Sequence, residues 1–592
     1  MNNYTDIYDF VIAQEAGYSK PIILEDGWSW SFKEHIRRSF LYKNSQFEEK
    51  NDDRNLRPFK NIVRPILNIQ YRTEGFDVKD IEIYVDNSES YFKSFLVKKF
   101  HDRWSLKNQI DTFIDEVVES YVDYGGTLVK NIDESRPEVV DLKTLAFCDQ
   151  TNILSGPFAI KHFFSPSELK EMKNWGDEKF GATMSIDGLI ALSEPKKSSS
   201  EGVISTPGNY IEVYEVHGTL PGKWLGKEED YLPQIQIIAF YKNDKDQKTG
   251  VTLFRAKESK LPFKFLPRDN IYGRALGFGG VEELFESQVW TNHSEIQIRE
   301  MLELASKTFY KTTDSRFKTR NNLINSDNGQ VFDLQEGKDI SQIDTSPRNI
   351  NLFNNILDRW EDHANRMGAA GDIFQGEQPT AGTPFASLQA QIIEGRSLHQ
   401  WRQGKIAVFI EEIYREWVLP HISKEILKGQ KFLSELSANE LQEISNQIVQ
   451  NLANKFVKER ILNGQLVFPE EVETFKQNAL DQFVSKGRNR FIEILKDEFK
   501  DEPLDIKANL VNKQKRLALF TDKLVSFVRQ ILARPDIKQD PDLVRMTNEI
   551  LEYSGMSPIS YGLKQSTGIT QGGGRTEPLK ELSARGLEAV EA

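Results

Sequence analysis

Apolar residues recur about every 3.6 positions between residues 281 and 309, the spacing of one face of an α-helix. Charged residues, mostly glutamates, fill the positions between them. The pattern predicts a helix of about 29 residues, roughly 43 Å long at 1.5 Å per residue. Its apolar positions are Leu284, Phe285, Val289, Ile296, Ile298, Met301, Leu302, Ala305 and Phe309.

Two further helices are predicted after this one, separated by non-helical segments. Residues 312–347 resemble a short β insert, because Asp327, Asn328 and Gly329 form a strong turn signal. A returning helix is expected over 349–367. The sequence 368–385 contains four glycines and two prolines, which cannot hold a regular helix or strand.

The third helix is expected over 386–427 and is very long, about 63 Å if straight. Gly395 and Gly404 weaken it, and Pro420 should kink or end it because proline lacks a backbone N–H. Helix, small β insert, returning helix, loop and long helix is an unusual order for an enzyme core. It is typical of a protein that projects a hairpin from its body.

The sequence before residue 277 predicts mixed helices and strands. Gly125 and Gly126 are expected to cap a helix, and polar residues 242–250 to connect two strands of a hairpin. Helices are expected over 31–46, 59–71, 91–104 and 106–124, and strands over 81–85, 127–131, 138–141, 210–216, 235–241 and 251–256. After the long helix, helical patterns cover 434–461, 470–499 and 506–556. A Gly/Ser/Thr-rich linker follows at 565–575.

Length and charge limit the interpretation. A chain of 592 residues is too long for one compact core, so several subdomains are expected. The net charge of −13 argues against a protein that grips nucleic acid over a broad basic surface. An acidic channel through which DNA slides is compatible with it, since carboxylates repel phosphates. The same charge is ordinary for a protein without a DNA role.

Compartment signals are few. No apolar run approaches the ~18 residues of a membrane span, so no membrane partner is expected. The polar N-terminus carries no secretory signal. The single cysteine, Cys148, excludes an intrachain disulfide and fits a reducing cytoplasm, and its neighbours Ala146 and Phe147 predict a buried position.

Sequence signals for catalysis are missing. There is no P-loop, the glycines at 277–280 do not fit a dinucleotide-binding fingerprint, and no zinc-protease helix motif occurs. One cysteine cannot build a cysteine-type zinc site. We therefore predict a non-enzyme with no catalytic, metal or cofactor-binding residues and no cofactor. An enzyme whose site assembles from distant residues remains the lower alternative.

Two stretches carry a family resemblance. The first runs from Gly273 and Arg274 through Gly277, Phe278, Gly279, Gly280, Val281, Glu282, Glu283, Leu284, Phe285, Glu286, Ser287 and Gln288 to Asn292, His293 and Ser294. The second runs from Gly368 to Pro384 and includes Asp372, Gln375, Gly376, Gln378, Pro379, Thr380, Gly382 and Thr383. Together with segments near 123–130, 149–154 and 164–169, their order resembles the portal proteins of tailed bacteriophages, across roughly residues 58–560.

The resemblance implies an α+β, multi-subdomain portal fold. It has a wing of mixed helices and strands, a helical stem, a small β clip, a long kinked wing helix and a helical crown. The implied divisions are an N-terminal extension (1–57), wing (58–276), first stem helix (277–311), clip (312–348), second stem helix (349–367), tunnel loop (368–385), long wing helix and following helices (386–490), crown (491–563) and flexible tail (564–592).

The resemblance also implies the function. The chain would form a homo-oligomeric ring, a dodecamer, at one capsid vertex of the virion after assembly in the host cytoplasm. The ring would line the channel for DNA packaging and ejection. Its partners would be double-stranded DNA, the large terminase, the major capsid protein and head–tail adaptor proteins. A head–tail or tail adaptor ring is the alternative, although adaptors are usually much shorter.

Three groups of site residues follow from these expectations. Tunnel-loop residues that narrow the channel are Gly371, Asp372, Phe374, Gln375, Gln378, Thr380 and Thr383. Channel-facing stem candidates are Glu282, Glu286, Glu295, Glu300 and Glu303. Clip candidates for contact with DNA or a partner are Arg316, Lys318 and Arg320, for which a solvated loop is the plainer interpretation.

Overall fold

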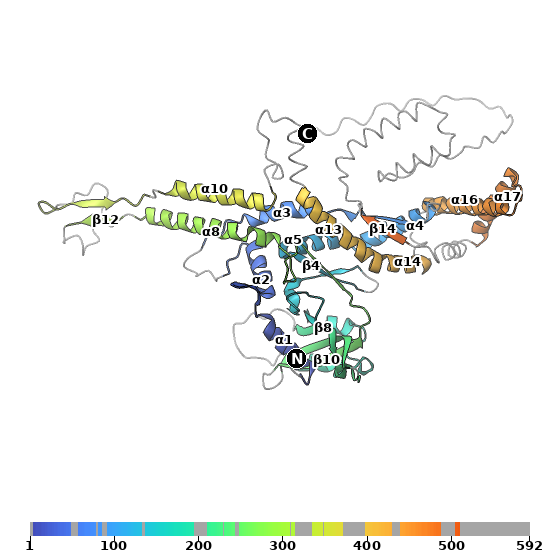
Figure 1. Cartoon of the computed structure of the whole chain (residues 1–592), viewed down its shortest axis with the longest axis horizontal. Helices are drawn as coiled ribbons and strands as arrows, with labels where there is room; N and C mark the ends of the chain where they lie inside the picture. Colours follow the sequence, from blue (N-terminus) through green and yellow to red (C-terminus); the bar gives the residue numbers. More distant parts are fainter. Residues whose placement is uncertain are drawn as a thin grey trace, which may run out of the picture. The chain divides into compact units, whose positions relative to one another are not determined.

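The fold was analysed in a computed structural model (Figure 1). The chain divides into two units, Met1–Leu510 and Val511–Ala592, and everything described below belongs to the first. The structure describes residues 4–48, 57–78, 81–85, 91–132, 136–193, 210–228, 230–242, 248–307, 309–313, 334–346, 349–370, 397–428, 438–486 and 504–508.

The N-terminal segment is part of the body rather than a detached arm. Helix α1 (Ile7–Tyr18) begins at Asp6, whose side chain accepts from the Tyr8 N–H, and it packs on strands β6 and β10. A short hairpin of β1 (Ile22–Glu25) and β2 (Trp28–Trp30) leads into α2 (Phe32–Lys43). Helix α2 is capped by Ser31 and packs against α5 and α8.

A five-stranded antiparallel sheet forms the largest β element, in the order β10-β9-β8-β7-β6. Its strands are β6 (Leu145–Phe147), β7 (Phe158–Phe164), β8 (Ile211–Pro221), β9 (Tyr231–Lys242) and β10 (Lys248–Lys257). A second sheet, β11-β4-β5, joins β11 (Phe263–Pro267), β4 (Gly126–Lys130) and β5 (Glu138–Val140). The strand at 210–216, the 235–241/251–256 hairpin and the pairing of 127–131 with 138–141 are thereby confirmed. Residues 213–217 are all buried, so the alternation in the sequence does not correspond to one buried and one exposed face.

Short helical turns surround these sheets. Helix α6 (Pro166–Glu171) starts with a capping box in which Ser165 and Glu168 exchange hydrogen bonds. The others are α7 (Ile186–Ser193) and the 3-10 turns Leu142–Thr144, Glu178–Phe180 and Gly222–Leu225. Cys148 is half-buried rather than buried, and its thiol lies 3.5 Å from the Tyr18 hydroxyl.

A buried charge cluster crosses the large sheet. The imidazole of His217 is fully buried, with Nε2 3.0 Å from Glu215 and Nδ1 3.0 Å from Glu258. Glu215 also accepts from Lys130 at 2.6 Å and lies 3.1 Å from His162. Burial by itself would lower the pKa of His217, but hydrogen bonds and charges from the two carboxylates outweigh burial and raise it.

The helical core assembles around α5 (Ile110–Tyr124), whose Val117 and Tyr121 are fully buried. It packs with α3 (Val63–Glu74), α4 (Tyr91–Lys107) and the start of α8. Helices α4 and α5 are separated at Asn108 and Gln109, where Gln109 has a left-handed backbone (φ 51°), and α5 ends at Gly125 (φ 80°) as expected.

The third long helix is continuous over residues 397–428, but its hydrogen-bond pattern changes from α to π and back to α. Helix α13 (Ser397–Ile413) runs into a π-helical turn (Tyr414–Val418), and α14 (Leu419–Lys428) follows. The π turn ends two residues before Pro420, which lacks a backbone N–H, so the change of helix type coincides with the predicted weak point. Of the predicted helix 386–427, residues 386–396 lie outside the described part of the chain.

Two elements differ from the sequence prediction. Phe309, assigned above to the first long helix, is the first residue of strand β12 and pairs with Ile343. Residues 506–508, assigned to a helical pattern, belong to strand β14 (Leu504–Ala508), which pairs antiparallel with β3 (Ile81–Val85). Residues 509–556 are outside the described ranges. In both cases the pairing partner is distant in sequence, so periodicity alone did not reveal it.

The helices before β14 form a second hairpin. Helix α16 (Ala438–Leu462) and α17 (Pro469–Lys486) meet through Asn463 and Gly464, as the turn signal predicted. Phe456 and Phe475 stack across them with ring centroids 4.6 Å apart. The turn exposes Leu462, Leu466 and Phe468.

Candidate functional site: a helical hairpin and its buried anchor

The predicted stem and clip segments form one hairpin (Figure 1). Helix α8 (Gly280–Ala305) leads to β12 (Phe309–Thr312), which pairs antiparallel with β13 (Ile340–Ile343), and α10 (Ile350–Met367) returns beside α8. Trp290 and Trp360 stack between the two helices. Lys60, from the segment before α3, forms an ion pair with Glu361 and lies 4.0 Å from Glu295.

Burial divides the hairpin into two halves. In α8 the buried residues end at Ser294, and α10 buries only Leu357 and Ala364. Exposed apolar side chains occur along both helices of the hairpin and on its β strands. They are Val289, Trp290, Leu302, Leu304, Phe309, Tyr310, Ile343, Leu352 and Met367.

The five glutamates predicted to face a channel lie in different environments. Glu282 accepts from both terminal nitrogens of Arg274, at 2.9 and 2.7 Å, and is therefore tied to the body. Glu286 lies on the part of α8 that faces α2. Beyond Ser294, Glu300 is 3.4 Å from the Gln297 amide and Glu303 is 3.3 Å from Lys307. Which of them face a channel stays a prediction.

The glycine cluster before α8 marks a crossing of three backbones. Gly277 donates its N–H to Gly125 O, and Phe278 donates to Asp269 O, both at 2.9 Å. A Cβ on Gly279 would lie 2.8 Å from Gly125 N, and one on Gly277 would lie 2.7 Å from Asp269 O. Side chains are therefore excluded by close approach. The sequence had indicated only a tight turn here.

Below this crossing lies a buried ionic network that the sequence did not reveal, which we call the anchor. It contains Glu74 of α3, Arg268 and Asp269 after β11, Glu283 of α8, and His399 and Arg402 of α13. Glu74 and Arg268 are completely buried. No compact motif marks these residues, because they come from chain segments around positions 74, 268, 283 and 400 that are far apart in sequence.

Each carboxylate of the anchor has a cationic partner. Arg268 Nη2 donates to Glu74 Oε1 at 2.8 Å. Arg402 Nη2 donates to Asp269 at 2.6 Å and to Glu283 at 2.5 Å. Burial alone would raise the pKa of Glu74, but the His399 hydrogen bond and the two guanidinium charges hold it below its usual value. Glu74 therefore remains ionised inside the protein.

The anchor lies beside the first end of the predicted tunnel loop. There, Gln70 Nε2 donates to Gly368 O at 3.3 Å, and His399 Nε2 lies 3.2 Å from Ala369 O. The second end of the loop, at residue 385, lies outside the described residues, and the chain is next described from Ser397, at the start of α13. The loop's named candidates, Gly371 through Thr383, lie outside the described residues, as do the clip candidates Arg316, Lys318 and Arg320.

Two further kinds of feature, metal-binding clusters and membrane-spanning helices, are absent among the described residues. Within the described ranges, no group of three or more His, Cys, Asp or Glu side chains is arranged to hold a metal ion. Among the same residues, no helix is long and apolar enough to cross a membrane.

Comparisons with known proteins give distant structural similarity. Neither a protein-family model nor a curated protein sequence matches the chain. A chain from the neck of an empty gene transfer agent particle, computed with six-fold symmetry, has 8% identity and a TM-score of 0.35, covering 77% of this chain and 99% of that one. A chain from the virion of a native gene transfer agent particle has 8% identity and a TM-score of 0.33, covering 94% and 100%.

Proposed function

We propose that this chain is a portal subunit of a tailed bacteriophage or phage-like particle, a structural protein rather than an enzyme. Copies would form a dodecameric ring at one capsid vertex, around a channel through which double-stranded DNA is packaged and ejected. The large terminase would supply ATP hydrolysis, and the major capsid protein and head–tail adaptors would dock on the ring. The virion is then the site of action, after assembly in the host cytoplasm.

The hairpin carries this proposal. The sequence resemblance assigns a stem helix, a clip, a second stem helix and a tunnel loop in that order. Helix α8, the β12–β13 pair and α10 occur in the same order, and the chain after Met367 returns to the anchor. A two-helix arm with a small β tip is not a typical enzyme core. Arms of neighbouring copies, side by side, would form the wall of a ring.

The apolar surface of the arm calls for neighbours on two sides. Leu302 and Leu304 are both about half exposed. Successive residues of an α-helix are rotated by about 100°. Leu302 and Leu304 are two positions apart, so their side chains lie on roughly opposite sides of α8. A heterologous interface that closes into a ring covers both sides of every subunit, whereas a two-fold dimer covers only one.

The charge of the arm fits a passage for DNA. The distal half of α8 carries Glu295, Glu300 and Glu303, and the chain as a whole has a net charge of −13. Carboxylates that line a channel repel phosphates, so a duplex meets no adhesive contact as it moves. Arg299 and Lys307 lie on the same helix, so the proposal concerns the face turned to the axis.

The direct test is the mass and image of the purified full-length chain. A ring is expected, with a mass near twelve times 68.2 kDa and a central hole in electron micrographs. A Leu302→Asp/Leu304→Asp variant should remain folded and lose the ring, because charges replace the apolar contact. Ile23→Asp changes an apolar residue on β1 that is even more exposed (79%) and should leave the ring intact. A wild-type monomer at micromolar concentration contradicts the proposal.

The loop has a separate test. Deleting residues 372–380 removes most of the tunnel-loop candidates and keeps Gly368 and Ala369, which contact Gln70 and His399. Rings should form normally, but particles assembled with them should package or retain less DNA, because the narrowest part of the channel is lost. DNA-filled heads of normal content from this variant would show that the segment has another role and would favour an adaptor-like ring.

A further inference from the structure

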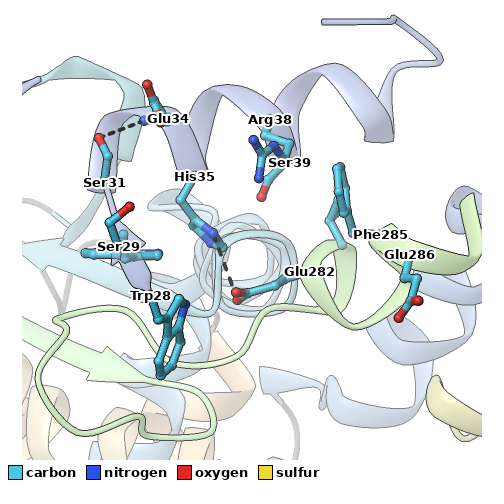
Figure 2. A pocket seen from close by; sticks show the side chains of 12 residues that line it. Trp28, Ser29, Ser31, Glu34, His35, Arg38, Ser39, Glu282, Phe285 and Glu286 are labelled. Atoms are coloured by element: carbon cyan, nitrogen blue, oxygen red, sulfur yellow. Dashed lines mark hydrogen bonds and ion pairs between the residues drawn. The ribbon is translucent and has the colours of Figure 1, made fainter. Parts of the chain in front are cut away.

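His35 is a buried titratable residue that joins three helices where the arm (α8, β12–β13 and α10) leaves the body. Figure 2 shows its imidazole pointing from α2 toward Glu282, in the first turn of α8. Its Nδ1 lies 3.9 Å from Glu282, and its Nε2 lies 3.2 Å from the backbone carbonyl of Tyr124, at the end of α5. Tyr124 directly precedes Gly125, one of the residues of the backbone crossing before α8. Contacts of His35 therefore link α2 to both sides of that crossing.

The contact with Tyr124 assigns the proton of the neutral imidazole. A backbone carbonyl only accepts, so Nε2 carries the proton and donates it, and Nδ1 presents a lone pair toward the Glu282 carboxylate. Two acceptors 3.9 Å apart form no hydrogen bond. Glu282 is held instead by both terminal nitrogens of Arg274, at 2.9 and 2.7 Å. The arrangement is therefore that of an uncharged His35.

Charged groups act on His35 in both directions, and burial outweighs them. Glu282 of α8 favours a positive imidazole, whereas Arg274 before α8 and Arg38 of α2 oppose one. Uncharged contacts come from two further elements, the Tyr124 carbonyl of α5 and the Trp30 ring of β2. Only 8% of the His35 side chain is exposed, and this removal from water is the largest effect, so the pKa of His35 is lowered.

A pocket of about 440 Å³ lies beside this contact, between β2, α2 and the first turns of α8 (Figure 2). His35 and Glu282 belong to its lining, as do the carboxylates of Glu34 and Glu286. Separation of α2 from α8 at this pocket would bring the imidazole into water, where a positive charge is no longer unfavourable. The neutral imidazole thus favours the packed arrangement of the two helices, and the protonated imidazole favours the separated one.

We propose that the His35 contact between α2 and α8 is an acid-sensitive device that opens when the imidazole is protonated. Opening frees the first turn of α8 from α2 on one side of the backbone crossing, so the direction of the arm becomes less fixed in acid. The device operates within one subunit. It is therefore independent of ring formation and of the proposed function.

The effect of pH on this contact has a defined sign and size. Neutral His35 stabilises the packed contact above the ordinary pKa of histidine, about 6.5, and this stabilisation is lost as pH falls below that value. One proton bound by the open form shifts the opening equilibrium by up to about tenfold per pH unit. Between pH 7.5 and pH 5.5 the equilibrium constant for opening should therefore rise by about tenfold.

Amide hydrogen exchange of the full-length chain, corrected for the intrinsic effect of pH, measures this equilibrium. Protection of residues 32–43 and 280–288 should fall by about tenfold over this range, while residues 235–241 of β9 keep theirs. His35→Gln removes the titrating group and should abolish the change. His293→Gln alters an exposed histidine further along α8 and should behave as the wild type. Unchanged protection in the wild type overturns the proposal, as does a pH dependence that persists in His35→Gln.

A second measurement needs no substitution and applies even if His35→Gln does not fold. Hydrogen exchange at the imidazole Cε1 position, followed by mass spectrometry of the full-length chain, reports the pKa of an individual histidine. The pKa of His35 should lie below about 6.5. A pKa at or above that value would mean that the packed contact tolerates the charge, and the proposal would fail.

Discussion

Trp290 of α8 and Trp360 of α10 stack with their ring planes 4° from parallel and their centroids 6.0 Å apart. This contact joins the two helices of the arm close to the point where burial against the body ends. Trp360→Ala should therefore loosen the arm by about 1 kcal/mol beyond the lost burial. The expected result is faster hydrogen exchange in residues 295–305 and 350–360, with the body unchanged.

Trp401→Ala is the control, because it removes another tryptophan that is exposed and lies on α13 rather than in the arm. It should leave exchange in the arm as in the wild type. Unchanged exchange in Trp360→Ala would show that the two helices are held together by their other contacts.

The anchor predicts a large penalty for removing one charge. Arg402→Met leaves Glu283 and Asp269 without their shortest ion pairs. Breaking a buried ionic network in this way is unfavourable by about 3–5 kcal/mol, and Arg402→Lys should recover part of the loss. Urea unfolding measures the difference. Arg460→Met, which breaks the exposed pair with Glu471, should lose less than about 1 kcal/mol; similar losses in both variants would refute the role of the anchor.

His217 gives a pH dependence of known sign. Its pKa is raised in the folded state by Glu215 and Glu258, so the protonated imidazole stabilises the fold. This contribution is fully present below the unfolded pKa of about 6.5 and is lost as pH rises through the higher folded value. The difference in unfolding free energy between wild type and His217→Gln should therefore be largest below pH 6 and shrink at alkaline pH.

His101 gives the opposite pH dependence of the unfolding free energy. The effect of His217 is therefore measured as the difference between wild type and the His217 variant. Burial lowers the pKa of His101 to about 4, so its contribution is present above about 6.5 and is lost as pH falls. The His101 contribution is the same in both proteins and cancels. A difference that grows with pH would contradict the assignment of charge to His217.

Glu300 and Glu303 allow the channel prediction to be tested without disturbing the fold. Both are exposed, and exposed charge changes usually alter stability by less than about 0.5 kcal/mol. Lysine at these positions adds phosphate contacts, so DNA passage should slow, most strongly at low salt. The rate of DNA entry into heads measures this. Glu470→Lys on α17 should have no effect, and unchanged packaging in the α8 variants would place these side chains away from the channel.

The sequence predicted the elements whose signals are local. The strand over 210–216, the hairpin of 235–241 with 251–256 and the glycine cap after residue 124 all depend on neighbours within a few residues. The helical prediction for Phe309 was wrong because its apolar spacing continues the helical repeat, while its strand partner Ile343 lies 34 positions further on. Such pairings leave no mark in a local pattern.

The anchor was beyond sequence reasoning for a different reason. Glu74, Arg268 and Arg402 each resemble an ordinary surface charge, and only their convergence in space makes burial tolerable. Glu282 illustrates the same point: the sequence made it a channel-facing candidate, and its guanidinium partner Arg274 is seen only in three dimensions. The glycines at 277–280 stand out in the sequence, but the close approach of Gly125 and Asp269 to them is seen only in the structure.

A small displacement where the backbones of Gly125, Gly277 and Gly279 cross is amplified along α8. Helix α8 leaves it with 26 residues, about 39 Å of rigid rod. A Cβ at Gly279 would force a separation from Gly125 N, and a tilt of only about 5° over that length displaces the far end by about 3.4 Å. The direction in which the arm leaves the body thus depends on Gly125, Gly277 and Gly279 having a hydrogen atom where other residues have a Cβ.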